Sequence, residues 1–359
     1  MLKVLRSKIY SCSFPDSRSI DEVASGAPKT IGPDHRQRSP RVPFPALRLR
    51  ERSTRPMTAL RPSLSPGQRR RRRREFRTAM AFVLPAAIGF TAFYLVPTIR
   101  GFYISLTDYN LMSAPSFIGL QNYVRLMGDP LFWNSVGVTL EYVVINIAVQ
   151  TVVAVGLAVL MHRLTRSVVI RGAILLPFLV SNVIAAMVWF LLLDFQLGLV
   201  NSAIEALGLT RIPFFADDTW AIPTIALVNV WRHAGYTALL VFAGLQMIPS
   251  YVYEAAAIDG SSEWRTFWKI TLPLLRPVLA LVLVITVTGS FQVFDTVAVT
   301  TRGGPINATR VIQYYIYQTG FGENDFGYAS AISVVLLLIL AVVSFFQLRM
   351  MRANQSDLA

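Results

Sequence analysis

The side chains best suited to chemistry lie together in an apolar stretch near residue 230, which reads NVWRHAGY. Asn229, Arg232, His233 and Tyr236 are spaced i, i+3, i+4 and i+7, so a helix would place them on one face. Polar side chains within an apolar segment are costly and commonly mark a solute or ion pathway. Amide and phenol groups suit sugar hydroxyls, whereas a guanidinium suits an anion. The stretch predicts a polar pathway, with a purely structural role for Arg232 and His233 as the alternative.

The sequence lacks the patterns that hydrolases and nucleotide-binding proteins carry. It contains no glycine-rich loop ending in Gly-Lys-Ser/Thr, no HExxH pair and no GxSxG turn, and it has only 3 histidines. The single cysteine, Cys12, permits no disulfide within the chain. We therefore expect no catalytic residues, no metal site, no cofactor held by this chain, and a protein that is not an enzyme.

The composition identifies the elements that must position these side chains. Hydrophobic residues make up 53% and charged residues 15% of the 359 residues, which is too apolar for an ordinary soluble protein. Runs of about 20 apolar residues are long enough to cross a bilayer. We predict an all-α, polytopic membrane protein with six transmembrane helices, at roughly residues 79–99, 136–160, 168–193, 220–247, 272–294 and 328–349.

The net charge of +14 is concentrated at one end of the chain. Residues 1–77 hold 20 of the 34 Lys and Arg residues but only 6 of the 20 Asp and Glu residues. The basic character therefore belongs to one tail and gives no evidence for nucleic-acid binding. Because this tail is rich in Arg, Pro and Ser, we expect it to be disordered and to meet anionic membrane lipid. Its lack of folding potential also raises the hypothesis that translation starts at Met57.

Positive charge orients the predicted helices. The run Arg69–Arg74 lies on the same side of the membrane as Arg163, Arg276 and Arg349, and this side is the more basic one. By the positive-inside rule, both termini face the cytoplasm. We divide the chain into a basic cytoplasmic tail (1–77), a membrane domain (78–350) and a short cytoplasmic C-terminal tail (351–359).

A polar interruption, Tyr253 to Pro277, separates the fourth and fifth predicted spans. Residues 254–258 favour a helix, and Gly260 is the natural place for it to end. Ser261 or Ser262 can cap a second helical turn. A short helix–turn–helix on the membrane surface suits docking against another protein better than it suits catalysis.

The same stretch resembles the EAA motif of permease subunits in ATP-binding-cassette importers. The phrases FIGLQNY, GLVNSAIEAL and TRGGP resemble carbohydrate-importer permeases of the maltose and glycerol-3-phosphate type, and within them the first of two paired permeases. Ser261 stands where the family usually has Ala. The residues that match the EAA motif are Glu254, Ala255, Ala256, Asp259, Gly260, Ile270, Leu272 and Pro273.

The resemblance implies the type I importer permease fold with a cytoplasmic EAA coupling helix, in the bacterial cytoplasmic (inner) membrane. It implies a heterodimer with a second permease subunit, two ATPase subunits that bind the ATP, and an extracytoplasmic solute-binding protein. It assigns ATPase coupling to Glu254, Ala255, Ala256, Asp259 and Gly260. It assigns the substrate pathway to Asn229, Arg232, His233, Tyr236, Ser290 and Val293.

The predicted function is therefore that of a transmembrane permease subunit of an ATP-driven importer for a sugar or sugar-derived solute. One alternative is an ion-coupled secondary transporter that uses His233 and Asp295 as a proton relay. Others are an importer permease for a non-sugar solute and a membrane-embedded enzyme. The sequence leaves the solute open between a neutral oligosaccharide and a phosphorylated glycerol.

Overall fold

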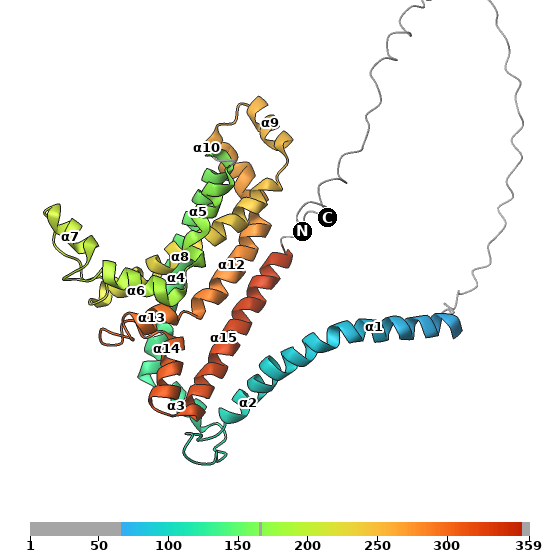
Figure 1. The fold of residues 1–359 in the computed structure, drawn as a ribbon, viewed down its shortest axis with the longest axis vertical. Coiled ribbons are helices and arrows are strands. Elements are labelled where there is room, and N and C mark those ends of the chain that lie inside the picture. Colours follow the sequence, from blue (N-terminus) through green and yellow to red (C-terminus); the bar gives the residue numbers. More distant parts are fainter. Residues whose placement is uncertain (1–65, 165–166, 354–359) are drawn as a thin grey trace, which may run out of the picture. The chain divides into compact units, whose positions relative to one another are not determined.

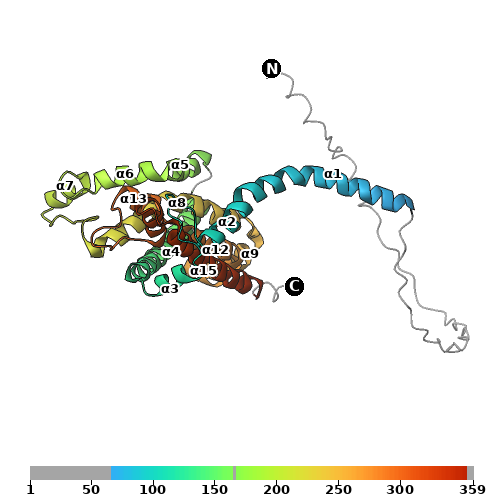
Figure 2. The same cartoon turned by 90° about the horizontal axis from the view of Figure 1, so that it is seen from below.

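The computed structural model describes residues 66–164 and 167–353, and helices form most of this part of the chain (Figure 1). The chain divides into two units, Met1–Arg69 and Arg70–Ala359, and all the helices except the start of the first lie in the second unit. Figure 2 shows the same helices from below. The long helices are α1 (Pro66–Phe90), α4 (Pro130–Leu164), α8 (Asp218–Gln246), α12 (Arg276–Phe291) and α15 (Phe326–Ala353). The shorter helices are α2 (Val96–Ile104), α3 (Gln121–Met127), α5 (Val168–Leu179), α6 (Asn182–Leu192), α7 (Leu199–Ala206), α9 (Ser250–Ile258), α10 (Glu263–Thr266), α11 (Leu272–Leu274), α13 (Asp295–Val299) and α14 (Ile312–Tyr317). Short π-helical segments join several of them, at Thr91–Leu95, Phe267–Thr271 and Gln318–Gly322.

Five stretches of the described chain are long and apolar enough to cross a membrane, namely Arg74–Ile104, Pro130–Arg163, Asp218–Gln246, Arg276–Val299 and Phe326–Arg349. The third predicted span, residues 168–193, instead consists of α5 and α6, which meet at an angle of 88°. The backbone is extended at the break, with ψ of 138° at Val180 and 143° at Ser181, shortly after Pro177. A run of apolar residues indicates the length of a segment but not whether it bends, so this bend is visible only in the structure. If the bent pair counts as one span, the total is six.

The basic tail differs from its prediction near its end. Helix α1 begins at Pro66, so residues 66–77 are helical where disorder was expected. Arginine is a good helix former, and the apolar residues that follow extend the same helix. Residues 1–65, with Met57 and most of the predicted tail, lie outside the described residues, as do residues 354–359.

The membrane core is built by α4, α8 and α12, which pack against one another. Near one end of the bundle, Tyr142, Ile225 and Phe291 belong to one buried apolar cluster. Near the other end, Ala158 and Val241 belong to a second cluster, together with Ala154, Met161, Ala238, Leu275 and Val282. Each of the three helices passes from one cluster to the other through a short polar segment. The fold therefore places a layer of polar side chains between two apolar layers.

A half-buried carboxylate, that of Asp129, ties together the loops at one end of the bundle. The Tyr315 and Tyr328 hydroxyls donate to Asp129 Oδ2, at 2.5 and 2.6 Å, and the Leu131 amide donates to Oδ1 at 2.9 Å. Arg125 adds an ion pair with Asp325 at 2.6 Å, and its guanidinium lies 4.0 Å from the centre of the Tyr328 ring. These contacts join the N-terminal end of α4 to α14 and α15.

Acid is expected to loosen this junction. Burial favours the neutral acid, but the hydrogen bonds from Tyr315 and Tyr328 outweigh it and lower the pKa of Asp129. A carboxylate whose pKa is lower in the folded state stabilises the fold above its unfolded pKa, and that contribution is lost as the pH falls through the folded pKa. Thermal unfolding of the protein in lipid should show stability falling as the pH drops below about 4.

An Asp129→Asn variant tests this origin. It should be less stable than the wild type near neutral pH and show a weaker dependence on acid, because the titrating group is gone. Asp218→Asn is the matched control. Asp218 is exposed in the first turn of α8 and accepts a hydrogen bond from the Thr219 hydroxyl. An equal acid dependence in the wild type and in Asp129→Asn would assign the effect to other groups.

Candidate functional site

A cavity of about 280 Å³ lies in the polar layer between the two apolar clusters. Helices α4, α5, α6, α8, α12 and α13 all contribute to its wall. Apolar side chains such as Leu240, Val282 and Ile285 form part of the surface. Its polar and aromatic lining residues are Tyr142, Asn146, Gln150, Phe178, Asn182, Asn229, His233, Tyr236, Thr237, Thr286, Ser290, Gln292, Phe294, Asp295 and Thr296.

The structure brings most of the predicted pathway residues together at this cavity. Asn229, His233 and Tyr236 line it from α8, and Ser290 and Val293 line it from the end of α12 and the residues after it. Arg232 is the exception, because it is not among the lining residues. The helical spacing in α8 therefore predicted that Asn229, His233 and Tyr236 face one cavity, but it did not separate Arg232 from them.

Arg232 holds the break between α5 and α6. Its Nε donates to the Val180 carbonyl at 2.8 Å and its Nη2 to the Phe178 carbonyl at 3.2 Å. The last carbonyls of a helix have no partner within the helix, and burying them unpaired is costly. The guanidinium supplies donors to these carbonyls from the neighbouring helix α8, which favours the structural reading of Arg232.

His233 is likewise engaged through both ring nitrogens. Its Nδ1 lies 2.9 Å from the Asn229 carbonyl oxygen, and its Nε2 lies 2.8 Å from Arg232 Nη1. Because a carbonyl only accepts and a guanidinium only donates, we assign the tautomer with the proton on Nδ1. The imidazole is then neutral, and only its carbon atoms remain to face the cavity.

Losing the guanidinium is expected to cost stability. An Arg232→Gln variant leaves carbonyls unpaired at the break and should lower the free energy of unfolding by about 2 kcal/mol or more. Thermal unfolding of the protein in lipid measures the loss. Arg100→Gln, at an exposed position in α2, is the control and should stay within about 0.5 kcal/mol of the wild type. Equal stability of the two variants would show that Arg232 does not hold the break.

A chain of polar contacts crosses the layer from α4 to α8 and α12, and sequence reasoning missed most of it. The Asn146 Nδ2 group donates to Gln150 Oε1 at 3.2 Å and to Ser290 Oγ at 2.9 Å. Gln150 Nε2 donates to Thr237 Oγ1 at 2.8 Å, and the Ser290 hydroxyl donates to the Thr286 carbonyl at 2.7 Å. The i, i+4 spacing of Asn146 and Gln150 within an apolar segment is the signal that could have found this chain of contacts.

A second polar contact closes the cavity on the side of the broken helix pair. Asn182 Nδ2, in the first turn of α6, donates to Asp295 Oδ2, in the first turn of α13, at 2.9 Å. In the same wall, the Thr296 hydroxyl donates to Asn229 Oδ1 at 3.2 Å. The sequence showed Asp295 only as a candidate proton carrier, and its partner 113 residues away became visible only in the fold.

The predicted ATPase-coupling residues lie beyond the C-terminal end of α8. Helix α9 begins at Ser250, with Pro249 as its N-cap. It ends before Gly260, whose φ is 67°, and Ser262 caps α10 by accepting from the Arg265 amide. We call residues 250–266 the coupling loop. Glu254, Ala255, Asp259 and Gly260 are exposed and Ala256 is buried.

An apolar side chain stands out on the coupling loop. Ile258, which the sequence analysis did not single out, is 86% exposed at the end of α9. Glu263, in α10, forms an ion pair with Arg163 at the end of α4. Tyr251 and Trp264 of the same loop are exposed as well, at 67% and 73%. Several exposed apolar side chains on one surface are typical of a protein-docking site.

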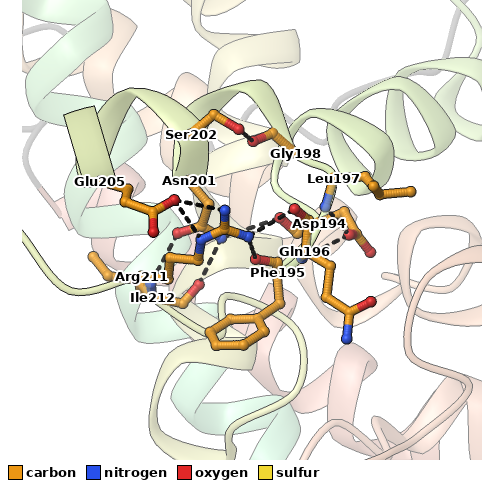
Figure 3. A network of polar contacts seen from close by, with 10 residues as sticks. All are labelled: Asp194, Phe195, Gln196, Leu197, Gly198, Asn201, Ser202, Glu205, Arg211 and Ile212. Atoms are coloured by element: carbon orange, nitrogen blue, oxygen red, sulfur yellow. Dashed lines mark hydrogen bonds and ion pairs between the residues drawn. The ribbon is translucent and has the colours of Figure 1, made fainter.

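The segment between α6 and α8, which includes α7, forms a compact polar network, shown in Figure 3. Arg211 donates to Glu205 Oε2 at 2.6 and 3.0 Å and to the carbonyls of Phe195 and Gln196 at 3.0 and 2.7 Å. Asn201 bridges the Asp194 and Ile212 backbones. The backbone amides of Leu197 and Gln196 lower the pKa of Asp194. The network holds α7 (Leu199–Ala206) in place.

The described residues give no indication of a metal centre. Within residues 66–164 and 167–353, no three His, Cys, Asp or Glu side chains gather as they would around a metal ion. The side chains that line the cavity offer hydrogen bonding, aromatic contact and the carboxylate of Asp295.

Residues 150–354 match the protein family described as "Binding-protein-dependent transport system inner membrane component". Among curated relatives, the trehalose/maltose transport system permease protein MalF of Thermococcus litoralis is 33% identical over 76% of this chain and 92% of its own length. The lactose transport system permease protein LacF of Rhizobium radiobacter is 35% identical over 74% and 91%. The sulfoquinovosyl glycerol transport system permease protein SmoG of Agrobacterium fabrum is 32% identical over 77% and 91%.

Among solved structures, this chain is similar to a bacterial ABC transporter involved in the import of the acidic polysaccharide alginate. The TM-score is 0.70 at 24% identity, over 78% of this chain and 96% of the other. A second structure of the alginate transporter, in complex with its alginate pentasaccharide-bound periplasmic protein, gives a TM-score of 0.71. At this identity the likeness concerns the fold, and the fold is that of an importer permease.

Proposed function

Because this chain belongs to the family of binding-protein-dependent transport system inner membrane components, we propose that it lines the membrane path of an ATP-driven importer for a sugar or sugar-derived solute. The cavity in the polar layer is the observation that carries the proposal, since the helices that form it are those that a solute would pass between. The relatives named above are permeases for carbohydrates, and family membership supports the role of a transporter subunit.

The proposed assembly follows the same reasoning. A second permease would complete the path, two ATPase subunits would bind ATP, and a solute-binding protein would deliver the cargo from outside. The last partner is supported by the alginate transporter, which was captured with its periplasmic protein. The basic residues near α1 and α15 support cytoplasmic placement of both termini.

The coupling loop is proposed to transmit ATPase closure to the membrane helices. Its exposed Ala255 and Ile258 and its fixed turn at Gly260 suit a rigid docking contact. Because the loop continues directly from α8, a push on it would move a helix that lines the cavity. Rocking of the two permeases would then expose the cavity first to one side of the membrane and then to the other.

The ion-coupled alternative finds no support at its key residue. A proton relay needs a histidine nitrogen that is free to exchange a proton with its neighbour. The contacts of His233 with Asn229 and Arg232 occupy both nitrogens. Nothing in the cavity therefore favours His233 and Asp295 as a relay.

Purification of the complex in lipid tests the proposed function. ATPase activity should rise several-fold when a sugar-loaded binding protein is added, because the delivered solute favours closure of the ATPases. Solute uptake into vesicles should stop when ATP is depleted. Uptake that survives ATP depletion and collapses with an uncoupler would refute the proposal, as would the absence of any co-purifying ATPase.

A further inference from the structure

Resting on the proposed function, we propose that the cavity accepts uncharged sugars and rejects anionic ones, and that the Asp295 carboxylate is the residue that enforces this choice. Family membership leaves the charge of the solute open. The inference comes from three features of the cavity wall: the absence of a free cation, the hydrogen bonds that the wall still requires, and the position of a single carboxylate.

The wall offers no cation to an anionic solute. Among the described residues that line the cavity, none is Lys or Arg, and the one imidazole, that of His233, is held neutral by its two contacts. Arg232 is within electrostatic range of Asp295, but it lies outside the cavity lining and its guanidinium donates to the Phe178 and Val180 carbonyls. A phosphate or carboxylate entering the cavity would leave water without gaining an ionic partner, which is unfavourable.

The lining atoms that lack a hydrogen-bond partner are amide oxygens, so a solute must offer them hydrogen-bond donors rather than acceptors. Asn146 Oδ1 and Asn182 Oδ1 are buried and have no hydrogen-bond partner. The orientation of both amides is set by their neighbours. Asn182 must turn its NH₂ toward the Asp295 carboxylate, which only accepts. Asn146 must donate to Ser290 Oγ, because that hydroxyl already donates to the Thr286 carbonyl.

Sugar hydroxyls fit this demand. A buried acceptor without a donor is unfavourable, and a solute hydroxyl could donate the missing hydrogen bond to each amide oxygen. Ionised carboxylate and phosphate groups carry only acceptor oxygens and cannot. The rings of Phe178 and Tyr236, stacked with centroids 4.6 Å apart and an interplanar angle of 12°, add an aromatic surface to the wall. Such a surface suits the C–H face of a pyranose ring.

The Asp295 carboxylate also repels an anionic solute, which already finds no cation in the cavity wall. It is the one Asp or Glu among the described lining residues, and its Oδ2 is bound by Asn182. A second negative charge brought beside it in a poorly screened site is disfavoured, and its own acceptor oxygens suit further solute hydroxyls. Selectivity against anions therefore belongs to the permease itself, in addition to any choice made by the binding protein.

The test measures binding to the intact complex in lipid discs without the binding protein, so that its selectivity does not interfere. The neutral probes are trehalose, maltose and lactose. The anionic probes are glucuronate-containing disaccharides of the same size and glycerol 3-phosphate. Equilibrium dialysis of labelled probes should show the neutral sugars binding about tenfold or more tightly than the anions. In Asp295→Asn this ratio should fall by about tenfold, because asparagine keeps the contact with Asn182 and removes the charge.

Asp217→Asn is the matched control. Asp217 caps α8 by accepting from the Thr219 amide at 2.9 Å, lies outside the cavity wall, and can be replaced by asparagine with its capping role intact. The ratio of the affinity for neutral sugars to the affinity for anions should be the same in Asp217→Asn as in the wild type. Anions that bind the wild type as tightly as neutral sugars, or an Asp295→Asn ratio equal to that of the wild type, would overturn the inference alone. If no probe binds and no sugar-loaded binding protein stimulates the ATPase, the proposed function fails with it.

Discussion

Replacing Gly260 with proline is expected to abolish ATP-driven uptake while leaving the protein inserted in the membrane. Gly260 has a φ of 67°, in the left-handed region, whereas proline holds φ near −65°. Proline also removes the amide that donates to the Ala257 carbonyl at 3.1 Å. The turn must therefore rearrange, at a cost of about 3 kcal/mol or more, and α9 and α10 lose the angle that presents the coupling loop.

Two measurements separate the loss of coupling from the loss of folding. Co-purification of the ATPase subunits and vesicle uptake should both fall to background in Gly260→Pro, while the amount of protein in the membrane stays at the wild-type level. Gly260→Ala should retain partial activity. A Cβ at this position meets nothing within 4 Å, so alanine adds only the backbone strain of about 1 kcal/mol.

Gly208→Pro is the matched control for this prediction. Gly208 follows α7 with a φ of 77°, donates its amide to the Glu205 carbonyl at 2.9 Å, and also has open space around its Cβ position. The backbone change is equivalent, but it falls outside the coupling loop. The ATPase subunits should therefore still co-purify. Normal uptake in Gly260→Pro would exclude the coupling loop as the docking contact.

A second large effect is expected at Gly235, where a single methyl group should disrupt the cavity wall. A Cβ at this position of α8 would lie 2.0 Å from the Ile174 carbonyl oxygen and 3.0 Å from the carbonyl carbon. Both atoms belong to the backbone of α5, so no side chain can turn aside. Gly235→Ala must push α5 away from α8, and overpacking of this kind lowers stability by about 3 kcal/mol or more.

The displaced helix carries Phe178, so the damage should reach the cavity as well. Thermal unfolding of the complex in lipid should show the loss of stability, and binding of a neutral sugar should weaken with it. Gly172→Ala, in α5 itself, is the control. A Cβ there meets nothing within 4 Å, and alanine favours a helix by about 1 kcal/mol over glycine. Equal unfolding temperatures for the two variants would refute the close approach of α5 and α8.

The coupling loop shows what could be predicted from sequence. Its helix, its glycine turn and its second cap are local features, since each depends on residues a few positions apart. The structure confirms the turn at Gly260 and the cap at Ser262, and it extends the first helix back to Ser250 with Pro249 as its N-cap. The family resemblance rested on the same local patterns, and the comparisons confirm it.

The polar face of α8 was predictable, but the roles of its residues were not. Helical spacing placed Asn229, His233 and Tyr236 together, and all of them line the cavity. The same spacing placed Arg232 beside them, although its partners are the Phe178 and Val180 carbonyls of another helix pair. Those carbonyls are free only because the third predicted span bends by 88°, and an apolar run does not record a bend.

The sequence by itself determined the membrane class, the family and the position of the coupling loop, because apolar length, charge asymmetry and turn chemistry are properties of neighbouring residues. Only the tertiary structure decided which polar side chains remain available to a solute. Asn146 meets Ser290 across 144 positions and Asn182 meets Asp295 across 113. Hydrogen bonds between distant residues consume some donors and leave some acceptors unpaired, and that balance exists only once the helices have packed together.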